Sequence, residues 1–353
     1  MTIQPSDFPA TIDTSWSVHG IPAVILSNWH LKVVVLPTLG GKIWEIHDRA
    51  TGRQHLWHNT RTPPAPLHFG AVFDDVFYGG WDDLFPNDQP EVLAGESYPD
   101  HGELWASAWD WDVTKSDGSV ILTMTLNTPI SASRFTKVVR LDPGARHLDM
   151  DVTVANSPTR SLPFLWKQHL ALPAIEGGII SIPGTYATMA DFGRPRAGTP
   201  GHRFPWPTLT KSGQRHDMSR VPSGSSGVSE FMYVDTPNEG WCALTHTDGS
   251  GVALIYDPKV FPSCWVFASY GGWRDHEVVI LEPCTGHPIS VIEGVAHATH
   301  RVLAPSEVIS TRVALAVYDG ISSVSSVTES DEGYDIHGPA LSGGARERRE
   351  QTS

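Results

Sequence analysis

The sequence contains little cysteine, only Cys242, Cys264 and Cys284 among 353 residues. Such an odd and sparse set does not build a disulfide framework and fits a reducing compartment. No two of them have the CxxC spacing of a thiolate zinc site. The sequence also lacks a basic N-terminal segment followed by an apolar run, and no stretch has the apolar length of a membrane span. We therefore expect a cytoplasmic protein without a membrane partner.

Basic residues are also under-represented, with 25 Lys and Arg against 39 Asp and Glu, which gives a formal net charge of -14. A strongly negative field repels the phosphates of nucleic acids and anionic lipid surfaces. Nucleic acid is therefore not an expected partner. A neutral ligand is more natural, although a local basic pocket can still hold an anion.

Long stretches with a helical apolar stripe are missing as well. Short runs typical of strands recur instead, between turns supplied by 32 Gly and 28 Pro, at residues 23–26, 31–36, 119–126, 147–154, 252–256 and 310–318. The run from His147 alternates with period two, which is typical of a half-buried antiparallel strand. Many strands, many turns and few helices predict an all-β fold, a large antiparallel β-sandwich.

No linker divides the middle of the chain, so we predict one domain over residues 1–320. Residues 1–14 are expected to form a strap or short strand. Residues 192–228, rich in Gly, Pro, Ser and Arg, are expected to form a long functional or covering loop. From residue 321 to 353 the composition shifts to Ser, Glu, Gly and Arg, which is typical of a disordered tail.

Four segments are dense in polar and aromatic residues that strand cores do not require: residues 78–87, 99–105, 164–169 and 281–288. The chain also holds 13 Trp and 17 His. The tryptophans either fill a large β core or lie in a cleft, where an indole face stacks on the C–H face of a sugar ring.

The order of these segments resembles the aldose 1-epimerase, or galactose mutarotase-like, superfamily. Leu39-Gly40-Gly41-Lys42-Ile43-Trp44 resembles its opening hairpin, and Gly79-Gly80 to Phe85-Pro86 followed by His101-Gly102 resembles its His-Gly element. Trp166-Lys167-Gln168-His169 and Leu281-Glu282-Pro283 resemble the strands of its catalytic histidine and glutamate, and Ala304-Pro305-Ser306-Glu307 resembles its closing turn. The matches follow the family order over roughly residues 30 to 318.

The resemblance implies a sandwich of roughly 15 to 20 strands with a site on the concave face of one sheet. It implies interconversion of the α and β anomers of a sugar, with Glu282 as base and His169 as acid, and His101 on the ring oxygen or a neighbouring hydroxyl. A carboxylate and a histidine near neutrality suit this proton transfer. No metal and no organic cofactor are implied. The partner is a sugar or sugar derivative, and the protein is expected to be a monomer or homodimer.

Each candidate residue also has a structural interpretation. Glu282 follows an apolar run, and a buried glutamate is uncommon unless it is paired, here with Lys167, Arg274 or another cation. His169 could be a hydrogen-bonded core histidine, and His101 could belong to a turn. Asp83 could hold sugar hydroxyls or cap a turn. The remaining candidates for substrate binding, which could equally be core residues or ion-pair partners, are Trp81, Trp105, Lys167 and Trp273.

The sequence departs from the best-known galactose mutarotases, which carry an Asn-Arg pair before the first histidine. Here the corresponding stretch, residues 68–75, has no Arg. A modified sugar, a glycoside or an acid sugar is therefore a candidate ligand. The cationic side chains that could meet an acid sugar, or else are solvated loop charges, are Arg194, Arg196, His202 and Arg203. Two other functions stay open, a non-catalytic carbohydrate-binding protein and another acid/base enzyme, an epimerase or a lyase.

Overall fold

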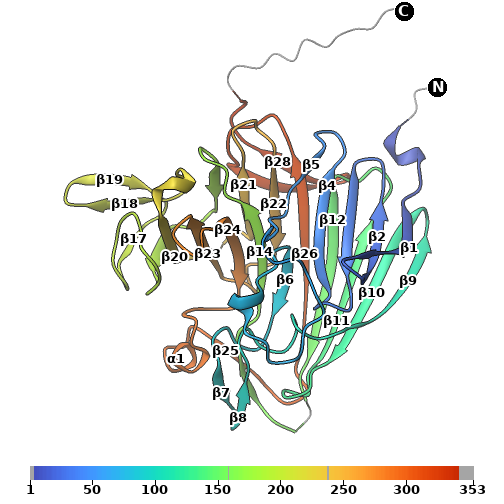
Figure 1. The fold of residues 1–353 in the computed structure, drawn as a ribbon, viewed down its shortest axis with the longest axis horizontal. Helices are drawn as coiled ribbons and strands as arrows, with labels where there is room; N and C mark the ends of the chain where they lie inside the picture. Colours follow the sequence, from blue (N-terminus) through green and yellow to red (C-terminus); the bar gives the residue numbers. More distant parts are fainter. Residues whose placement is uncertain (1–3, 158, 237, 342–353) are drawn as a thin grey trace, which may run out of the picture.

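The fold is known from a computed structural model, which describes residues 4–157, 159–236 and 238–341 (Figure 1). Two large sheets face each other, and the pairings between their named strands are antiparallel. The twelve-stranded sheet runs in the order β1 (Thr11–Val18), β2 (Ile21–Ser27), β3 (Leu31–Leu36), β4 (Lys42–Asp48), β6 (Trp81–Leu84), β14 (Lys167–Pro173), β24 (Glu277–Cys284), β23 (Ser263–Tyr270), β20 (Val228–Asp235), β16 (Tyr186–Met189) and β17 (Arg203–Pro205), with β5 (Arg53–Gln54) beside β4.

The eight-stranded sheet runs in the order β15 (Ile179–Ser181), β21 (Trp241–Thr245), β22 (Gly251–Tyr256), β26 (Val308–Tyr318), β12 (His147–Ala155), β11 (Arg134–Leu141), β10 (Ser119–Asn127) and β9 (Asp110–Ser116). Four small hairpins or pairs complete the strands: β7 (Glu91–Leu93) with β8 (Glu96–Tyr98), β13 (Leu162–Phe164) with β25 (Arg301–Leu303), β18 (Thr208–Lys211) with β19 (Gln214–Asp217), and β27 (Ser326–Ser330) with β28 (Gly333–His337).

Helices are few and short. They are the α-helix α1 (Val291–Ala296) and the 3-10 turns η1 (Pro5–Asp7), η2 (Phe73–Val76) and η3 (Gly224–Ser226). No helix in the described part of the chain is long and apolar enough to cross a membrane.

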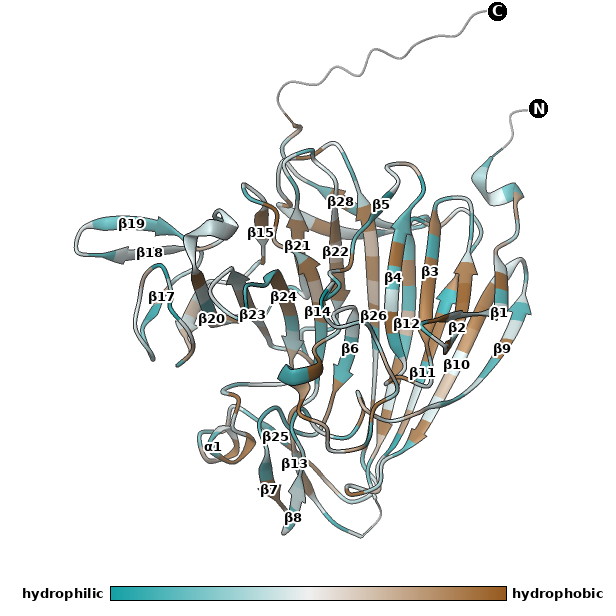
Figure 2. Cartoon of the chain, viewed as in Figure 1, coloured by the Kyte–Doolittle hydropathy of each residue, from teal (hydrophilic) through white to brown (hydrophobic). Residues whose placement is uncertain are grey.

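The predicted all-β sandwich is confirmed, and all six predicted strand runs lie within strands of the two large sheets. Apolar and polar residues alternate along the strands, so that each sheet has an apolar face for the core. Figure 2 shows this alternation as a change of hydropathy along the ribbons. On β12, Leu148, Met150, Val152 and Val154 are buried in the core between the sheets, while Asp151 is exposed. A strand of period two has one face for the core and one for solvent or a second layer.

The expectation of a loop over residues 192–228 needs correction, because the segment contains β17 and the β18–β19 hairpin. Leu209 and Phe204 are buried, so apolar residues anchor these strands in the core. The hairpin extends away from the sandwich in Figure 1.

The expected disordered tail is wrong for residues 321–341, which include the β27–β28 hairpin. Val324 is buried, and its amide donates a hydrogen bond to Ser181 Oγ at 3.2 Å. Val327 and Ile336 pack against the cluster around Trp241 and Tyr318. These apolar contacts outweigh the polar composition of the segment. Residues 342–353 lie outside the described part of the chain, and the assignment of residues 1–320 to one domain stays a prediction.

A buried ion pair joins the two sheets. Lys137 of β11 pairs with Asp83 of β6, and each side chain is 1% exposed. The ammonium also donates to Gly41 O at 3.1 Å and lies 5.3 Å from the centre of the Trp109 ring. Asp83 further accepts from Trp166 Nε1 at 3.2 Å. Removing one partner of such a pair leaves an uncompensated buried charge.

We therefore expect Lys137→Met to lower the free energy of unfolding by about 3–5 kcal/mol in denaturant titrations. Lys32→Met is the matched control, because Lys32 pairs with Glu45 at the surface, and a change of at most about 1 kcal/mol is expected there. Adding Asp83→Asn to Lys137→Met should restore part of the loss. Equal stability of Lys137→Met and the wild type would contradict the role given to this pair.

Candidate active site

The register of three neighbouring strands brings the two predicted catalytic residues together. On β14, Lys167 is opposite Cys284 and Leu170 is opposite Leu281 of β24, so His169 falls opposite Glu282. On the other side, His169 is opposite Asp82 of β6. The row continues from Glu282 to Trp265 and then Tyr233. Residues far apart in sequence thus form one cross-strand row.

This row lies on the face of the twelve-stranded sheet that is turned away from the core. Leu170 packs in the core, and Gln168 accepts a hydrogen bond from Trp81 Nε1 at 2.8 Å on the core side. Because side chains alternate along a strand, Lys167 and His169 point to the opposite face.

A cavity of about 750 Å³ opens over this face and is lined by Lys167, His169 and Glu282. The remaining walls come from η2 and Phe77, from residues 88–89 and 100–101, from residues 188–192 and 200–201, and from residues 287–299 around α1. The volume lies within the range of roughly 300–1,000 Å³ typical of small-molecule sites.

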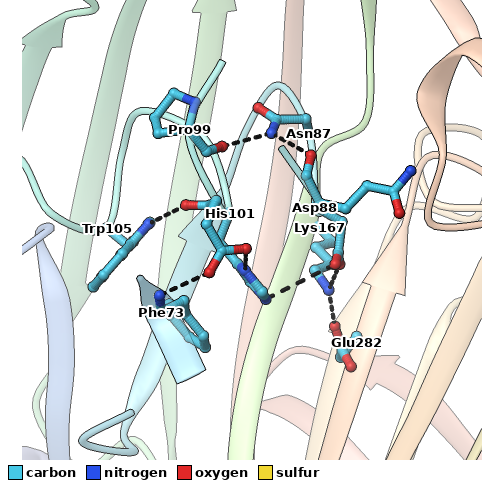
Figure 3. A network of polar contacts seen from close by, with 10 residues as sticks. Phe73, Asn87, Asp88, Pro99, His101, Trp105, Lys167 and Glu282 are labelled. Atoms are coloured by element: carbon cyan, nitrogen blue, oxygen red, sulfur yellow. Dashed lines mark hydrogen bonds and ion pairs between the residues drawn. The ribbon is translucent and has the colours of Figure 1, made fainter. Parts of the chain in front are cut away.

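Charged side chains along the cavity wall are linked to one another by ion pairs and hydrogen bonds (Figure 3). The Lys167 ammonium forms ion pairs with both Asp88 and Glu282, and it lies 4.6 Å from the centre of the Trp265 ring. Asp88 Oδ1 is 3.9 Å from His101 Nε2, and His101 Nδ1 is 2.8 Å from Asp100 Oδ1. Lys167 therefore pairs with two carboxylates, and Asp88, one of these two, also faces His101, which has Asp100 on its other side.

The two carboxylates on Lys167 differ in their affinity for a proton. Burial raises the pKa of Glu282 to about 7, and the nearby ammonium of Lys167 opposes this shift only in part. For Asp88, burial acts in the same direction, but Lys167 and His101 outweigh it and lower the pKa. Asp88 therefore keeps its charge, and Glu282 exchanges a proton near neutral pH.

His101 and His169 also differ in their affinity for a proton. Burial alone would lower the pKa of His101, but Asp88 and the hydrogen bond with Asp100 outweigh it and raise the pKa. Burial lowers the pKa of His169 well below its usual value, and the charges of Lys167 and His101 add to this. The sequence analysis expected His169 to titrate near neutrality, but the structure makes it the neutral member of the pair.

The structure brings five of the predicted site residues to the cavity: His101, Lys167, His169, Trp273 and Glu282. The other three do not line it. Trp81 and Asp83 point into the core between the sheets, because they alternate with Asp82 along β6. Trp105 is buried behind the His101 loop, where its Nε1 donates to Asp100 O at 3.1 Å. The structure therefore corrects the predicted contacts of these three with a ligand.

The cationic residues proposed for an acid sugar are also absent from the cavity lining. Arg196 pairs with the buried Glu230 at 2.5 Å. Arg203 pairs with Asp235 at 2.9 Å and lies over the Tyr186 ring. These partners explain Arg196 and Arg203 without an anionic ligand.

Sequence reasoning missed Asp88 and most of the aromatic lining. The polar and aromatic segment at residues 78–87 ends one residue before Asp88, and an aspartate there is typical of an ordinary turn. Phe73, Phe77, Phe231 and Phe267 line the cavity but come from three separate segments, which are η2 with the residue after it, β20 and β23. Their sequence pattern does not differ from that of core residues.

No group of three or more His, Cys, Asp or Glu side chains with metal-ligand geometry occurs within residues 4–157, 159–236 and 238–341.

Comparison with solved structures fixes the fold. A protein named Slr1438 from Synechocystis sp. PCC 6803 matches with a TM-score of 0.64 and 15% identity, covering 88% of this chain and 100% of the other. A galactose mutarotase-like protein from Clostridium acetobutylicum matches with a TM-score of 0.65 and 16% identity, covering 88% and 99%. The chain has the galactose mutarotase-like fold.

A protein from Escherichia coli K12 described as a proposed aldose 1-epimerase has the same fold, with a TM-score of 0.60, 17% identity and coverage of 88% and 99%. No protein-family model matches the sequence, and no curated protein matches it. The match in structure at such low identity agrees with a divergent member of the fold.

The opposite pKa shifts of His101 and His169 give a direct spectroscopic prediction. In NMR of protein with labelled histidines at pH 6.5, we expect the His101 ring to be mostly protonated and the His169 ring to be neutral. His101→Asn and His169→Asn identify the two signals. A His169 ring that is protonated at this pH would contradict the electrostatics described above.

Proposed function

We propose that the cavity catalyses the interconversion of the α and β anomers of a sugar, with Glu282 as the base. The observation that carries the proposal is a buried carboxyl group with a pKa of about 7, opposite His169 and close to the charged His101. A base titrating near working pH is suited to take and return a proton. The descriptions of several proteins of the same fold support the proposal.

The reaction needs two proton transfers at neighbouring oxygens. Glu282 removes the proton from the anomeric hydroxyl while His101 donates a proton to the ring oxygen. The bond between the anomeric carbon and the ring oxygen breaks, and the anomeric oxygen becomes the aldehyde oxygen. After rotation about the bond between the first two carbons, the ring closes on the other aldehyde face and both protons return.

His169 acts beside this pair as a neutral hydrogen-bonding group. The centres of the His101 and His169 rings are 6.3 Å apart and nearly perpendicular. This separation leaves room for one sugar oxygen to contact both rings. Phe73 and Phe77 contact His169 edge-to-face at 5.2 and 5.6 Å and hold its orientation. In this assignment His101 supplies the proton and His169 orients the ring oxygen.

Lys167 and Asp88 set the protonation of the acid/base groups. The ammonium stabilises the Glu282 carboxylate after the proton has been returned to the sugar, and Asp88 keeps His101 charged. Trp273 also lines the cavity, where its indole can cover the apolar face of a sugar ring. The polar groups thus surround one region of the cavity.

The direct test is anomer exchange measured by NMR on a panel of free aldoses. Glu282→Gln keeps the size of the side chain but removes the base, so we expect a loss of exchange of about 10²- to 10⁴-fold. Glu277→Gln is the control, because Glu277 is exposed on the same strand. Wild-type exchange in Glu282→Gln would exclude Glu282 as the base. A sugar that binds without accelerated exchange would favour a binding protein instead.

The pH profile gives an independent prediction. Exchange should rise with pH as Glu282 loses its proton around pH 7, and it should fall at higher pH as His101 loses its proton. The charge of Asp88 raises the pKa of both groups. Asp88→Asn should therefore move both the rising and the falling part of the pH profile to lower pH. Asp112→Asn, an exposed site on β9, should leave the profile unchanged, and an unmoved profile in Asp88→Asn would contradict the assignment.

A further inference from the structure

One wall of the cavity is a continuous series of aromatic rings, only part of which the proposed reaction uses. The ring centres of Phe73 and Phe77 are 5.5 Å apart, those of Phe77 and Trp273 are 6.2 Å apart, and those of Trp273 and Phe267 are 5.3 Å apart. From Phe267 the series branches to Phe192 at 4.8 Å and to Phe231 at 5.9 Å. All six rings line the cavity.

Strand geometry fixes the distance from this aromatic wall to the acid/base row. Phe231, Phe267 and Ile280 stand opposite one another on β20, β23 and β24. Each lies two residues from the row formed by Tyr233, Trp265 and Glu282. Two residues of a strand span roughly 7 Å and keep the same face. This is close to the width of a pyranose ring, so a group on the far side of a bound sugar reaches the aromatic wall.

The apolar lining is larger than an unsubstituted sugar requires. One indole or phenyl face covers the C–H face of a hexose, yet Ile280, Ile289 and Met189 extend the six rings here. A single hexose is also much smaller than the drug-sized ligands that cavities of about 750 Å³ hold. A cavity lined to this extent by apolar side chains is suited to an apolar group on the ligand.

The charges around the cavity exclude an anionic substituent. Asp74, Asp191 and Glu293 line it with exposed side chains. The Lys167 ammonium is already shared by two carboxylates, and His101 lies between Asp88 and Asp100. Lys167 is the only Lys or Arg among the described residues of the lining, so a phosphate or carboxylate on the sugar would find no free ammonium or guanidinium group there.

We propose that the ligand is a reducing sugar that carries a neutral apolar group, aryl or acyl, on a hydroxyl away from the anomeric carbon. The inference rests on the proposed function for the orientation of the sugar, because the anomeric hydroxyl must be free and face Glu282. The apolar group then lies against Phe267, Phe231 and Phe192.

The test measures binding by calorimetry with mono-benzyl ethers of D-glucose and D-galactose at O3, O4 and O6. At least one ether should bind about tenfold more tightly than its parent sugar, as expected for burial of a phenyl group. The 6-phosphates of the same sugars should bind more weakly than the parents. If no ether binds more tightly than its parent, or if none of these probes binds, the proposal is wrong.

Substitutions of the phenylalanines test where the apolar group of the ligand binds, which we call the apolar subsite. Phe267→Ala and Phe192→Ala should remove the advantage of the benzyl ether and leave the affinity of the parent sugar within about twofold. Phe267→Leu, checked by thermal unfolding, covers the case in which Phe267→Ala does not fold. Trp111→Ala is the matched control, since Trp111 is an exposed aromatic residue on β9. An unchanged preference in all the Phe variants would overturn the assignment.

The proposed apolar subsite and the proposed catalysis can be refuted independently of each other. Tight binding of a benzyl ether without accelerated exchange would refute the proposed catalysis and support the apolar subsite. Accelerated exchange of the parent sugars without preference for any ether would support the catalysis and refute the subsite.

Discussion

The sharing of one ammonium by two carboxylates governs the chemistry of this cavity. Lys167 is 2% exposed and pairs with both Asp88 and Glu282, so the buried set carries more negative than positive charge unless a further proton is bound. Asp88 is stabilised by His101 as well, which leaves Glu282 as the group that gains and loses a proton. Burial keeps His169 neutral in the first place, and the ammonium and the charged His101 add to this because both disfavour a second cation beside them.

The sandwich makes this arrangement possible by separating charges onto two faces of one sheet. The consecutive residues Asp82 and Asp83 pair with Lys42 and Lys137 on opposite sides of β6. On β14, Lys167 and His169 face the cavity while Gln168 and Leu170 face the core. The period of two along a strand thus supplies both an inter-sheet ion pair and an acid/base row. Rigid strands hold the row, and the surrounding loops bring His101 and Asp88 to it.

Sequence patterns predicted the regular part of this structure well. The alternating run from His147 marked a sandwich strand, and Glu282 after an apolar run marked a carboxylate worth examining. Patterns could not assign the face of a short strand such as β6, and so Trp81 and Asp83 were placed with the ligand although they lie in the core. Nor could they show that Asp88 meets Lys167, since that contact depends on how a loop folds over β14. The protonation states of His101 and His169 depend on burial, which sequence does not give.

The titration of Glu282 itself tests the account most directly. In uniformly ¹³C-labelled protein, the side-chain carboxyl signal of Glu282, identified by its absence in Glu282→Gln, can be followed by NMR as the pH changes. The account predicts a midpoint of about 7, well above that of an ordinary glutamate. A midpoint at or below the ordinary value of about 4.3 would contradict it, because Glu282 would then be a fixed ion-pair partner of Lys167 and no acid/base group.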